Sequence, residues 1–311
     1  MPFQKLLLML FASLLMLSCN NNPYKKDGDK HRLSSPDNVL LLEFWLGDEG
    51  EPMYRLFRED KVVIEASALG IEMETYNLAK GFEVGGVFTY TADETWEQPW
   101  GEQRFIRDHH TGMQIVLKQP DNKIGMKLNF RLFDDGLGFR YEWDESSGLT
   151  DFIIKNEKTE FNLPADHRAW WLEAYIPNRY EHLFTESPVS EMDTVHTPLT
   201  MRSEDGLYLS IHEAALTDYS AMSIINRGDQ KLETTLFPWM DGSGDKVRAT
   251  APFVSPWRTI KVSDDPGGLL TNYIDLNLNE PSKIEDTSWI EPSKYVGIWW
   301  DMHLETKSWS S

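Results

Sequence analysis

The chain has 311 residues, of which 41% are hydrophobic and 26% charged, a composition typical of a globular protein that excludes a largely disordered chain. Its 50 acidic and 30 basic residues give a formal net charge of −20, which repels phosphate backbones, so we expect no nucleic-acid partner and a neutral or cationic ligand. The aromatic content is 12%, and aromatic side chains both fill protein cores and stack on sugars.

The first segment has the pattern of an export signal. Lys5 precedes an apolar run over residues 6–17 that is too short to span a bilayer comfortably, and Cys19 follows it. A cysteine here resembles a bacterial lipoprotein signal, in which it becomes the acylated first residue; an ordinary signal with a cysteine nearby is the alternative. Residues 1–18 are the expected signal peptide and Cys19 the expected lipidation site.

The next segment predicts an anchored, exported protein. Residues 19–33 are polar without a periodic apolar pattern, which is typical of a tether between anchor and folded domain. Asn20 after the cysteine favours the outer membrane of a Gram-negative bacterium, by resemblance to known sorting rules, although the periplasm stays open. We expect the lipid anchor to be the protein's contact with the membrane.

From Val39 onward the pattern is almost entirely that of β-strands. In "KLNFRLF" Leu128, Phe130 and Leu132 alternate with polar residues, and "FRYEW" alternates again after "DDGLG", which predicts a hairpin. Similar runs are "LLLEFWL", "MYRLFRE", "KVVIEA", "MQIVLK", "DFIIKNEKTEFNL", "LYLSIHEA", "RTIKVSD" and "NYIDLNL". So many strands without crossover helices predict an all-β fold, a large antiparallel sandwich over residues 34–285.

The character of the sequence changes after this predicted domain. Pro281 and Pro292 lie among polar residues, as in a domain linker. Residues 295–300 then have the composition of a buried strand and are followed by Asp301. Because a buried strand needs neighbours on both sides, we expect residues 286–311 to be a linker and the start of a second domain.

The motif "HEAAL" does not fit a zinc site. A zinc-binding helix needs a second histidine four residues after His212, and Leu216 stands at that position. The motif follows the strand-like "LYLSI". We therefore expect Glu213 to make a structural contact at a strand end, with an arginine such as Arg258.

Three other stretches allow more than one interpretation. The adjacent His109 and His110 would point to opposite faces of a strand, so they do not suit one metal ion, and we expect both at a turn. The acid-rich residues 93–102 suit either a sugar- or calcium-binding loop or structural packing of their tryptophans. The aromatic residues 169–184 suit either a loop packed over the sandwich edge or one that reaches into a neighbouring site.

Ten motifs, read in order over residues 34 to about 309, resemble the amino-terminal domain of glycoside hydrolase family 97. They are "SSPDNVLLLEF", "VIEASALGIEM", "DETWEQPWGE", "FRLFDDGLGFRYE", "TPLTM", "DGLYLSIHEAALTDYS", "PWRTI", "LNLNEPS", "DTSWI" and "KYVGIWWDM". The resemblance implies a β-super-sandwich followed by a (β/α)₈ barrel, of which "KYVGIWWDM" would be the first strand. A barrel needs about 250 residues, so the resemblance implies a truncated chain.

The resemblance also implies a chemistry. The family divides into calcium-dependent inverting α-glucosidases and retaining α-galactosidases, and "DETWEQPWGE", "HEAALTDYS" and "GIWWDM" are more similar to the first branch. The two catalytic carboxylates would lie in the missing barrel, so no acidic residue of this chain is expected to be catalytic. The resemblance implies Ca²⁺ as cofactor with Glu181 as a ligand, Glu173 being the alternative, and sugar binding by Trp299, Trp300 and Asp301.

We therefore expect the intact protein to be an exo-acting α-glucosidase that hydrolyses starch-derived oligosaccharides by an inverting, calcium-assisted mechanism. The 311-residue chain by itself should be inactive. The alternatives are an α-galactosidase with the same domain plan and a stand-alone carbohydrate-binding lipoprotein. The DNA beyond residue 311 separates an enzyme from the stand-alone lipoprotein, since an in-frame continuation supports an enzyme and a stop codon supports the binding protein.

Overall fold

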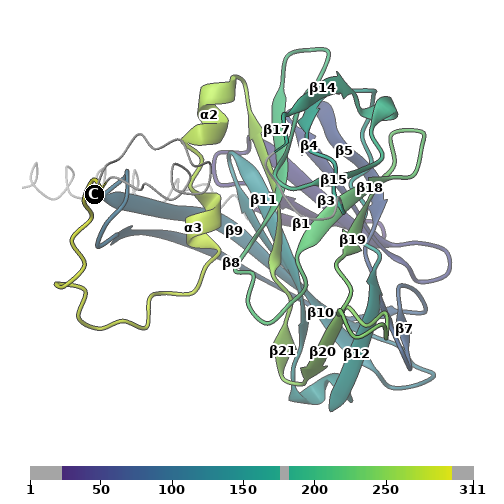
Figure 1. Ribbon diagram of the computed structural model, residues 1–311. Helices are drawn as coiled ribbons and strands as arrows, with labels where there is room; N and C mark the ends of the chain where they lie inside the picture. Colours follow the sequence, from purple (N-terminus) through teal and green to yellow (C-terminus); the bar gives the residue numbers. More distant parts are fainter. Residues whose placement is uncertain (1–22, 176–181, 296–311) are drawn as a thin grey trace, which may run out of the picture.

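The computed structural model describes residues 23–175 and 182–295, and its regular elements are almost all antiparallel strands (Figure 1). Within these ranges the strands form sheets of five, ten, four and three strands. The predicted all-β sandwich is confirmed. No helix in the same ranges is long and apolar enough to cross a membrane.

The first sheet is a meander in which each strand pairs with the next one along the chain. Its strands are β1 (Tyr24–Asp27), β2 (Lys30–Ser34), β3 (Leu40–Leu46), β4 (Pro52–Arg58) and β5 (Lys61–Ala68).

The start of this sheet corrects the predicted tether, because residues 24–34 form the antiparallel hairpin of β1 and β2. Leu33 is fully buried on one face of β2. On the other face, Lys30 and Arg32 form ion pairs with Glu43 of β3 at 2.8 and 2.7 Å. The period of two was present in the sequence, but the charged residues on the outer face obscured it.

The largest sheet runs in the order β14-β13-β16-β17-β22-β11-β10-β9-β8, and the short β21 pairs with β11. In chain order its strands are β8 (Glu83–Glu97), β9 (Phe105–Lys118), β10 (Gly125–Phe133), β11 (Gly136–Trp143), β13 (Arg168–Trp171), β14 (Thr185–Pro188), β16 (Leu199–Arg202), β17 (Tyr208–Ala214), β21 (Phe253–Val254) and β22 (Trp257–Ser263).

The hairpin predicted from alternation is the pair β10 and β11. Phe130 lies directly opposite Phe139 in the register. The residues predicted on the buried face, Leu128, Phe130 and Leu132, are at most 1% exposed. The period of two therefore gave both the pairing and the buried face correctly.

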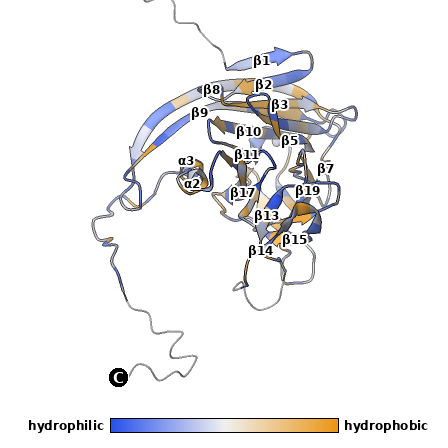
Figure 2. Cartoon of the chain, turned by 90° about the horizontal axis from the view of Figure 1, so that it is seen from above, coloured by the Kyte–Doolittle hydropathy of each residue, from blue (hydrophilic) through white to orange (hydrophobic). Residues whose placement is uncertain are grey.

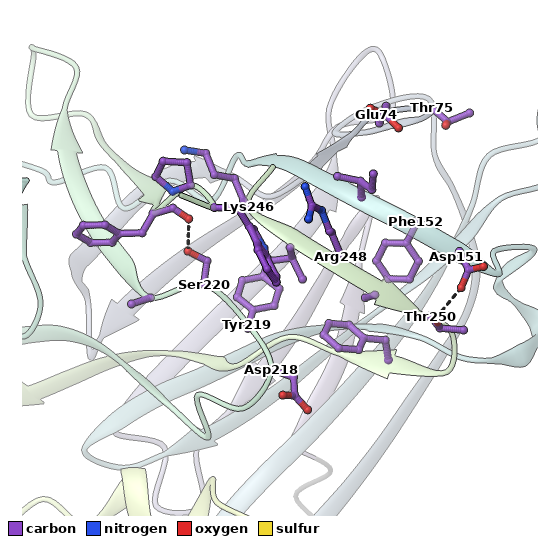
Figure 3. Close-up of a pocket in the computed structure, with 18 of the residues that line it drawn as sticks. Glu74, Thr75, Asp151, Phe152, Asp218, Tyr219, Ser220, Lys246, Arg248 and Thr250 are labelled. Carbon is purple, nitrogen blue, oxygen red and sulfur yellow. Dashed lines mark hydrogen bonds between the residues drawn. The ribbon is translucent and has the colours of Figure 1, made fainter. Parts of the chain in front are cut away.

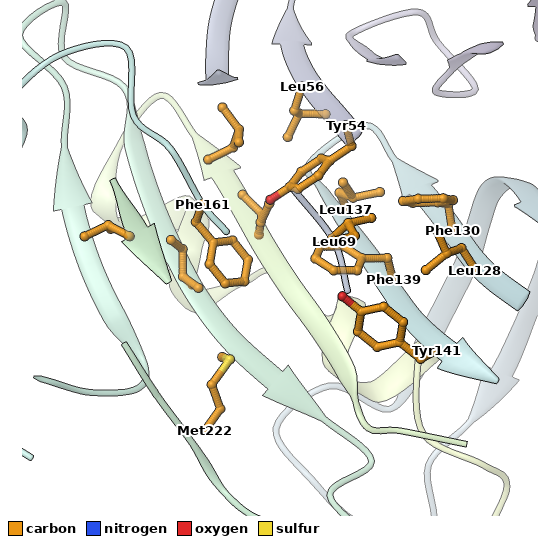
Figure 4. Close-up of a cluster of buried hydrophobic side chains, with 14 of the residues drawn as sticks. Tyr54, Leu56, Leu69, Leu128, Phe130, Leu137, Phe139, Tyr141, Phe161 and Met222 are labelled. Carbon is orange, nitrogen blue, oxygen red and sulfur yellow. The ribbon is translucent and has the colours of Figure 1, made fainter. Parts of the chain in front are cut away.

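The five-stranded and ten-stranded sheets pack face to face around one core. The rings of Phe44 on β3 and Phe130 on β10 lie 6.0 Å apart, and those of Tyr54 on β4 and Phe139 on β11 lie 5.3 Å apart. Figure 2 shows hydrophobic residues gathered where these sheets meet, and Figure 4 shows Tyr54, Phe130 and Phe139 in this core. Removal of this apolar area from water is the main stabilising contribution to the fold.

Two smaller sheets contribute side chains to the same core, among them Ile154, Ile224 and Leu232. The four-stranded sheet has the order β20-β12-β6-β7 and the other has the order β15-β18-β19. Their strands are β6 (Ile71–Met73), β7 (Asn77–Leu78), β12 (Asp151–Glu157), β15 (Thr194–His196), β18 (Met222–Asn226), β19 (Leu232–Leu236) and β20 (Val247–Thr250).

The helical elements of the described ranges are short, and one of them corrects a prediction. They are the 3₁₀ turns η1 (Glu145–Ser147) and η2 (Val189–Glu191) and the helices α2 (Pro266–Leu270) and α3 (Ile274–Asn277). The run "NYIDLNL" was predicted to be a strand but contains α3. The side chain of Asn272 accepts a hydrogen bond from the backbone N–H of Ile274 at 3.1 Å, and Ile274 and Leu278, four residues apart, pack on Trp257.

Strands β8 and β9 are 15 and 14 residues long and extend beyond the sandwich as a hairpin (Figure 1). The acid-rich residues 93–102 form the far part of this hairpin. Trp96 Nε1 donates a hydrogen bond to Asn277 Oδ1 at 2.9 Å, and Asn277 Nδ2 donates to the carbonyl of Arg107 at 2.9 Å. These contacts favour the structural interpretation for Trp96, which joins the hairpin to the end of α3.

The adjacent histidines lie within β9, where His109 is opposite Asp93, so the predicted turn is wrong. His110 is only 2% exposed, and its Nδ1 lies 2.6 Å from Oδ1 of Asp108. A histidine with a carboxylate partner can be buried in a sheet, and this pairing is not visible in the sequence.

Candidate functional site

All five of the predicted site residues lie outside the described ranges of the structure. They are Cys19, Glu181, Trp299, Trp300 and Asp301. The expected signal peptide lies there as well, and so does the expected first barrel strand from residue 296 onward. Lipidation, calcium binding and sugar binding by these residues therefore stay predictions.

The alternative calcium ligand, Glu173, is described. It is exposed, and it forms an isolated β-bridge with Val195. Calcium takes six to eight oxygen ligands in proteins. Within residues 23–175 and 182–295 no group of three His, Cys, Asp or Glu side chains could hold a metal ion. Glu173 does not form a calcium site with any other described residue.

An aromatic cluster lies next to Glu173 in the chain. The ring of Tyr175 is 4.4 Å from that of Phe237, and its hydroxyl is 3.2 Å from Oγ1 of Thr235. The ring of His196 stacks on Phe237 at 6.3 Å. Burial, and secondly the neighbouring His182, lower the pKa of His196, so this cluster is uncharged at neutral pH. An uncharged aromatic surface suits packing against a neutral group.

The aromatic stretch 169–184 combines the two interpretations that the sequence left open. Its first part is packed, since Ala169 is fully buried and Trp171 Nε1 donates to Ser187 Oγ at 3.1 Å. Its last part is not packed, since Leu183 is 94% and Phe184 65% exposed. Large apolar side chains exposed together are typical of a surface that receives another molecule or domain.

The predicted contact between Glu213 and Arg258 is confirmed. Arg258 Nη1 donates to Oε2 of Glu213 at 2.5 Å, and Arg258 has no exposed surface. The sequence did not reveal the second partner, Glu157, which accepts from Nε and Nη2 of Arg258 at 2.8 and 2.6 Å. Burial alone would lower the pKa of Arg258, but the two carboxylates outweigh it and raise the pKa, so the guanidinium stays charged.

His212, the residue before Glu213 on β17, is expected to make the stability of the fold depend on pH. Burial lowers the pKa of His212; Asp275 and Glu213 raise it to a lesser extent, and Lys261 and Arg258 lower it further. The unfolded chain, with a histidine pKa of about 6.5, therefore takes up a proton first as the pH falls. This contribution to stability is complete above about pH 6.5 and decreases below it.

We expect His212→Gln to reduce the loss of unfolding free energy between about pH 7.5 and about pH 5.5. Urea unfolding at both pH values measures it. Some loss should remain in the variant, because burial also lowers the pKa of His31 and His167. An unchanged pH dependence in His212→Gln would contradict the assignment.

A groove of about 1170 Å³ lies beside β12 and β20 and is completed by residues 218–221 and 237–240 (Figure 3). Tyr219 lines it, and the hydroxyl of Tyr219 donates to Oε2 of Glu157 at 2.9 Å. The groove is therefore connected by a hydrogen bond to the buried charge network. Its volume is somewhat larger than the roughly 300–1,000 Å³ of most ligand sites in proteins.

The most exposed large aromatic side chain in the groove is Trp239, at 50%. The guanidinium of Arg248 lies 4.7 Å from the centroid of its ring. Arg248 is itself held by Asp241 and Asp245, at 2.6 Å from each. The sequence did not indicate this groove, because the residues that line it come from segments far apart in the chain. Trp239, which precedes Met240 and an acidic glycine-rich turn, was the signal that could have indicated it.

Comparison with known proteins gives the family. The profile described as "Glycosyl-hydrolase 97 N-terminal" matches residues 33–281. A glycoside hydrolase family 97 enzyme from Pseudoalteromonas sp. strain K8, solved with panose and with acarbose, is 37% identical with a TM-score of 0.84. The alignment covers 90% of this chain and 42% of that one.

Two curated relatives are similar to this chain. A probable retaining alpha-galactosidase from Streptomyces bingchenggensis is 29% identical over 86% of this chain and 40% of its own length. A retaining alpha-galactosidase from Bacteroides thetaiotaomicron is 21% identical over 86% of this chain and 44% of its own. The chain thus spans about two fifths of the length of the relatives that it matches. With the profile matched over most of its residues, the chain belongs to glycoside hydrolase family 97, of which it carries the N-terminal domain.

Proposed function

We propose that this chain is the N-terminal part of an exported glycoside hydrolase that removes glucose from the ends of α-linked oligosaccharides. The observation that carries the proposal is the 37% identity with the K8 enzyme, whose structures hold panose and acarbose. Panose consists of glucose units. The curated galactosidases are less similar, at 29% and 21% identity.

An α-galactosidase is the second candidate, because both curated relatives carry that name. The same names are of retaining enzymes, so they support retention over the inversion expected from the sequence. The two outcomes need different spacings of the catalytic carboxyl groups, about 5–5.5 Å for retention and about 6.5–9.5 Å for inversion. The anomeric configuration of the first product, followed by NMR, decides between them.

The cofactor, the sugar contacts and the anchor belong to the proposal too. Glu181 would supply one carboxylate to Ca²⁺, which when bound can polarise a water molecule or carboxyl group. Trp299, Trp300 and Asp301 would contact the sugar. Acylation of Cys19 would hold the exported protein at the outer membrane or in the periplasm.

The test uses the complete reading frame without its signal peptide, assayed on α-glucosides and α-galactosides with calcium and with a chelator. We expect calcium-dependent hydrolysis of glucosides, and no turnover by the 311-residue chain. Glu181→Gln should lower calcium affinity or activity about 10- to 100-fold. The matched control is Glu186→Gln, because Glu186 is exposed and forms a 3.8 Å ion pair with Arg168.

The outcomes separate the two candidates. Preferential hydrolysis of galactosides would replace the first candidate by the second. Activity that is equal with calcium and with the chelator, or equal in Glu181→Gln and the control, would remove calcium and Glu181 from the proposal. Hydrolysis by the 311-residue chain would show that the catalytic groups lie within it.

A further inference from the structure

We propose that the groove beside β12 and β20 is a carbohydrate-binding site that holds a neutral oligosaccharide against the ring of Trp239. The proposal assigns a ligand to this domain by itself, apart from hydrolysis. It rests on the proposed function only for the class of sugar.

The first argument is the platform formed by Trp239. Trp239 lines the groove and is 50% exposed, and the guanidinium of Arg248 lies over its ring at 4.7 Å from the centroid. Arg248 cannot swing freely because Asp241, Asp245 and Ser243 Oγ accept hydrogen bonds from it at 2.6, 2.7 and 3.1 Å. A ring fixed before binding loses little freedom on binding, and the apolar C–H face of a pyranose packs on such a ring.

The second argument is the presence of a hydrogen-bond donor without a charged partner. The ammonium of Lys246 donates to the backbone carbonyl of Leu236 at 2.7 Å, and burial lowers its pKa. Among the described residues no carboxylate forms an ion pair with it. An ammonium has three donors, so Lys246 retains donors for the hydroxyl groups of a sugar. Figure 3 shows Lys246 and Arg248 on the wall of the groove.

The third argument is the charge of the groove. Its lining holds the carboxylates Glu74, Asp151 and Asp218 and the cations Lys246 and Arg248, a net charge of −1. The chain as a whole carries −20. Asp241 and Asp245, which neutralise Arg248, lie outside this sum, so the groove is acidic like the rest of the protein and repels a polyanion. A neutral ligand rich in hydroxyl groups meets no such repulsion and matches the donors.

The floor of the groove is rigid. Tyr219 and Phe253 stack with their ring centroids 6.4 Å apart, and Phe253 meets Phe152 edge to face at 6.0 Å. The hydroxyl of Tyr219 is tied to Glu157, the buried partner of Arg258. A groove on such a floor keeps its shape without a ligand, as preformed ligand sites do.

The experiment is calorimetric titration of the 311-residue chain with panose and, separately, with raffinose, a trisaccharide that ends in galactose. We expect saturable binding of at least one of them, weakened about tenfold or more by Trp239→Ala. Lys246→Met should weaken binding as well. The control is Trp289→Ala, since Trp289 is 69% exposed and lies outside the groove. Circular dichroism verifies that each variant is folded.

Absence of saturable binding by the parent chain overturns the proposal, and so does binding that is unaffected in folded Trp239→Ala. A preference for raffinose over panose would support the site while opposing the glucoside assignment. Hydrolysis is measured on the complete reading frame, so an inactive enzyme would leave the binding result intact. The two proposals can therefore fail separately.

Discussion

Replacing Arg258 with methionine is expected to lower the free energy of unfolding by about 3–5 kcal/mol. Arg258 has no exposed surface, and its guanidinium is held by Glu157 and Glu213 at 2.6 and 2.5 Å. Its removal leaves two carboxylates, 0% and 7% exposed, without the cation that compensates for their burial. A buried carboxylate without a cation nearby strongly destabilises the folded state, because it has lost its hydration without gaining a partner. Urea unfolding at 25 °C measures the loss.

The matched control is Arg58→Met, which removes a surface ion pair. Arg58 pairs with Asp264, whose side chain is 77% exposed, so we expect a loss of about 0–1 kcal/mol. A triple variant in which Glu157 and Glu213 also become glutamine should recover part of the loss from Arg258→Met, because no uncompensated charge then remains. A loss equal to that of the control would mean that water reaches the network.

Only part of the buried network of Arg258, Glu213 and Glu157 could be predicted from the sequence. The motif pair "HEAAL" and "PWRTI" gave the contact between Glu213 and Arg258, because a glutamate at a strand end needs a cation when buried. Glu157 was not identified, since its segment reads as one more strand and nothing in its spacing indicates a bidentate partner 101 residues away. The alternation of apolar and polar residues along one strand does not indicate which distant charged residues will pair.

The strands show the same limit on a larger scale. The runs over β10 and β11 were predicted correctly because a single period governed burial and pairing there. In β2 the period was masked by Lys30 and Arg32, whose partner Glu43 lies on another strand. The sequence around α3 shows both an apparent alternation and a spacing of four between Ile274 and Leu278. The helix forms because these two residues pack together and the side chain of Asn272 accepts a hydrogen bond from the N–H of Ile274.

The groove was out of reach for a different reason. Its lining combines β12, β20 and two connecting segments, so only the folded chain brings Trp239, Tyr219 and Lys246 together. Each of these residues has an ordinary structural interpretation in the sequence. The family resemblance did not help here, since it directed attention to Glu181 and the residues after 295, which lie outside the described ranges. The candidate site that can be tested on this domain therefore comes from the structure.

The second large effect is expected in the core, where Phe139→Ala should cost about 3–5 kcal/mol of unfolding free energy. Phe139 has no exposed surface, and its ring lies 5.3, 6.0 and 6.2 Å from the rings of Tyr54, Phe130 and Phe161. These residues come from the five-stranded sheet, the ten-stranded sheet and the segment after β12 (Figure 4). Truncation would leave a cavity among rigid rings that cannot collapse into it, so the transfer and cavity contributions add.

The control for Phe139→Ala is Phe88→Ala on β8, since Phe88 is 61% exposed and should change stability by about 0.5 kcal/mol or less. Phe139→Leu should fall between the two, because leucine fills part of the volume. The three variants, measured by urea unfolding under one set of conditions, test whether the two sheets share one cooperative core. If Phe139→Ala cost no more than Phe88→Ala, the face-to-face packing of Tyr54, Phe130 and Phe139 would not be what stabilises the sandwich, and the core would have to lie elsewhere.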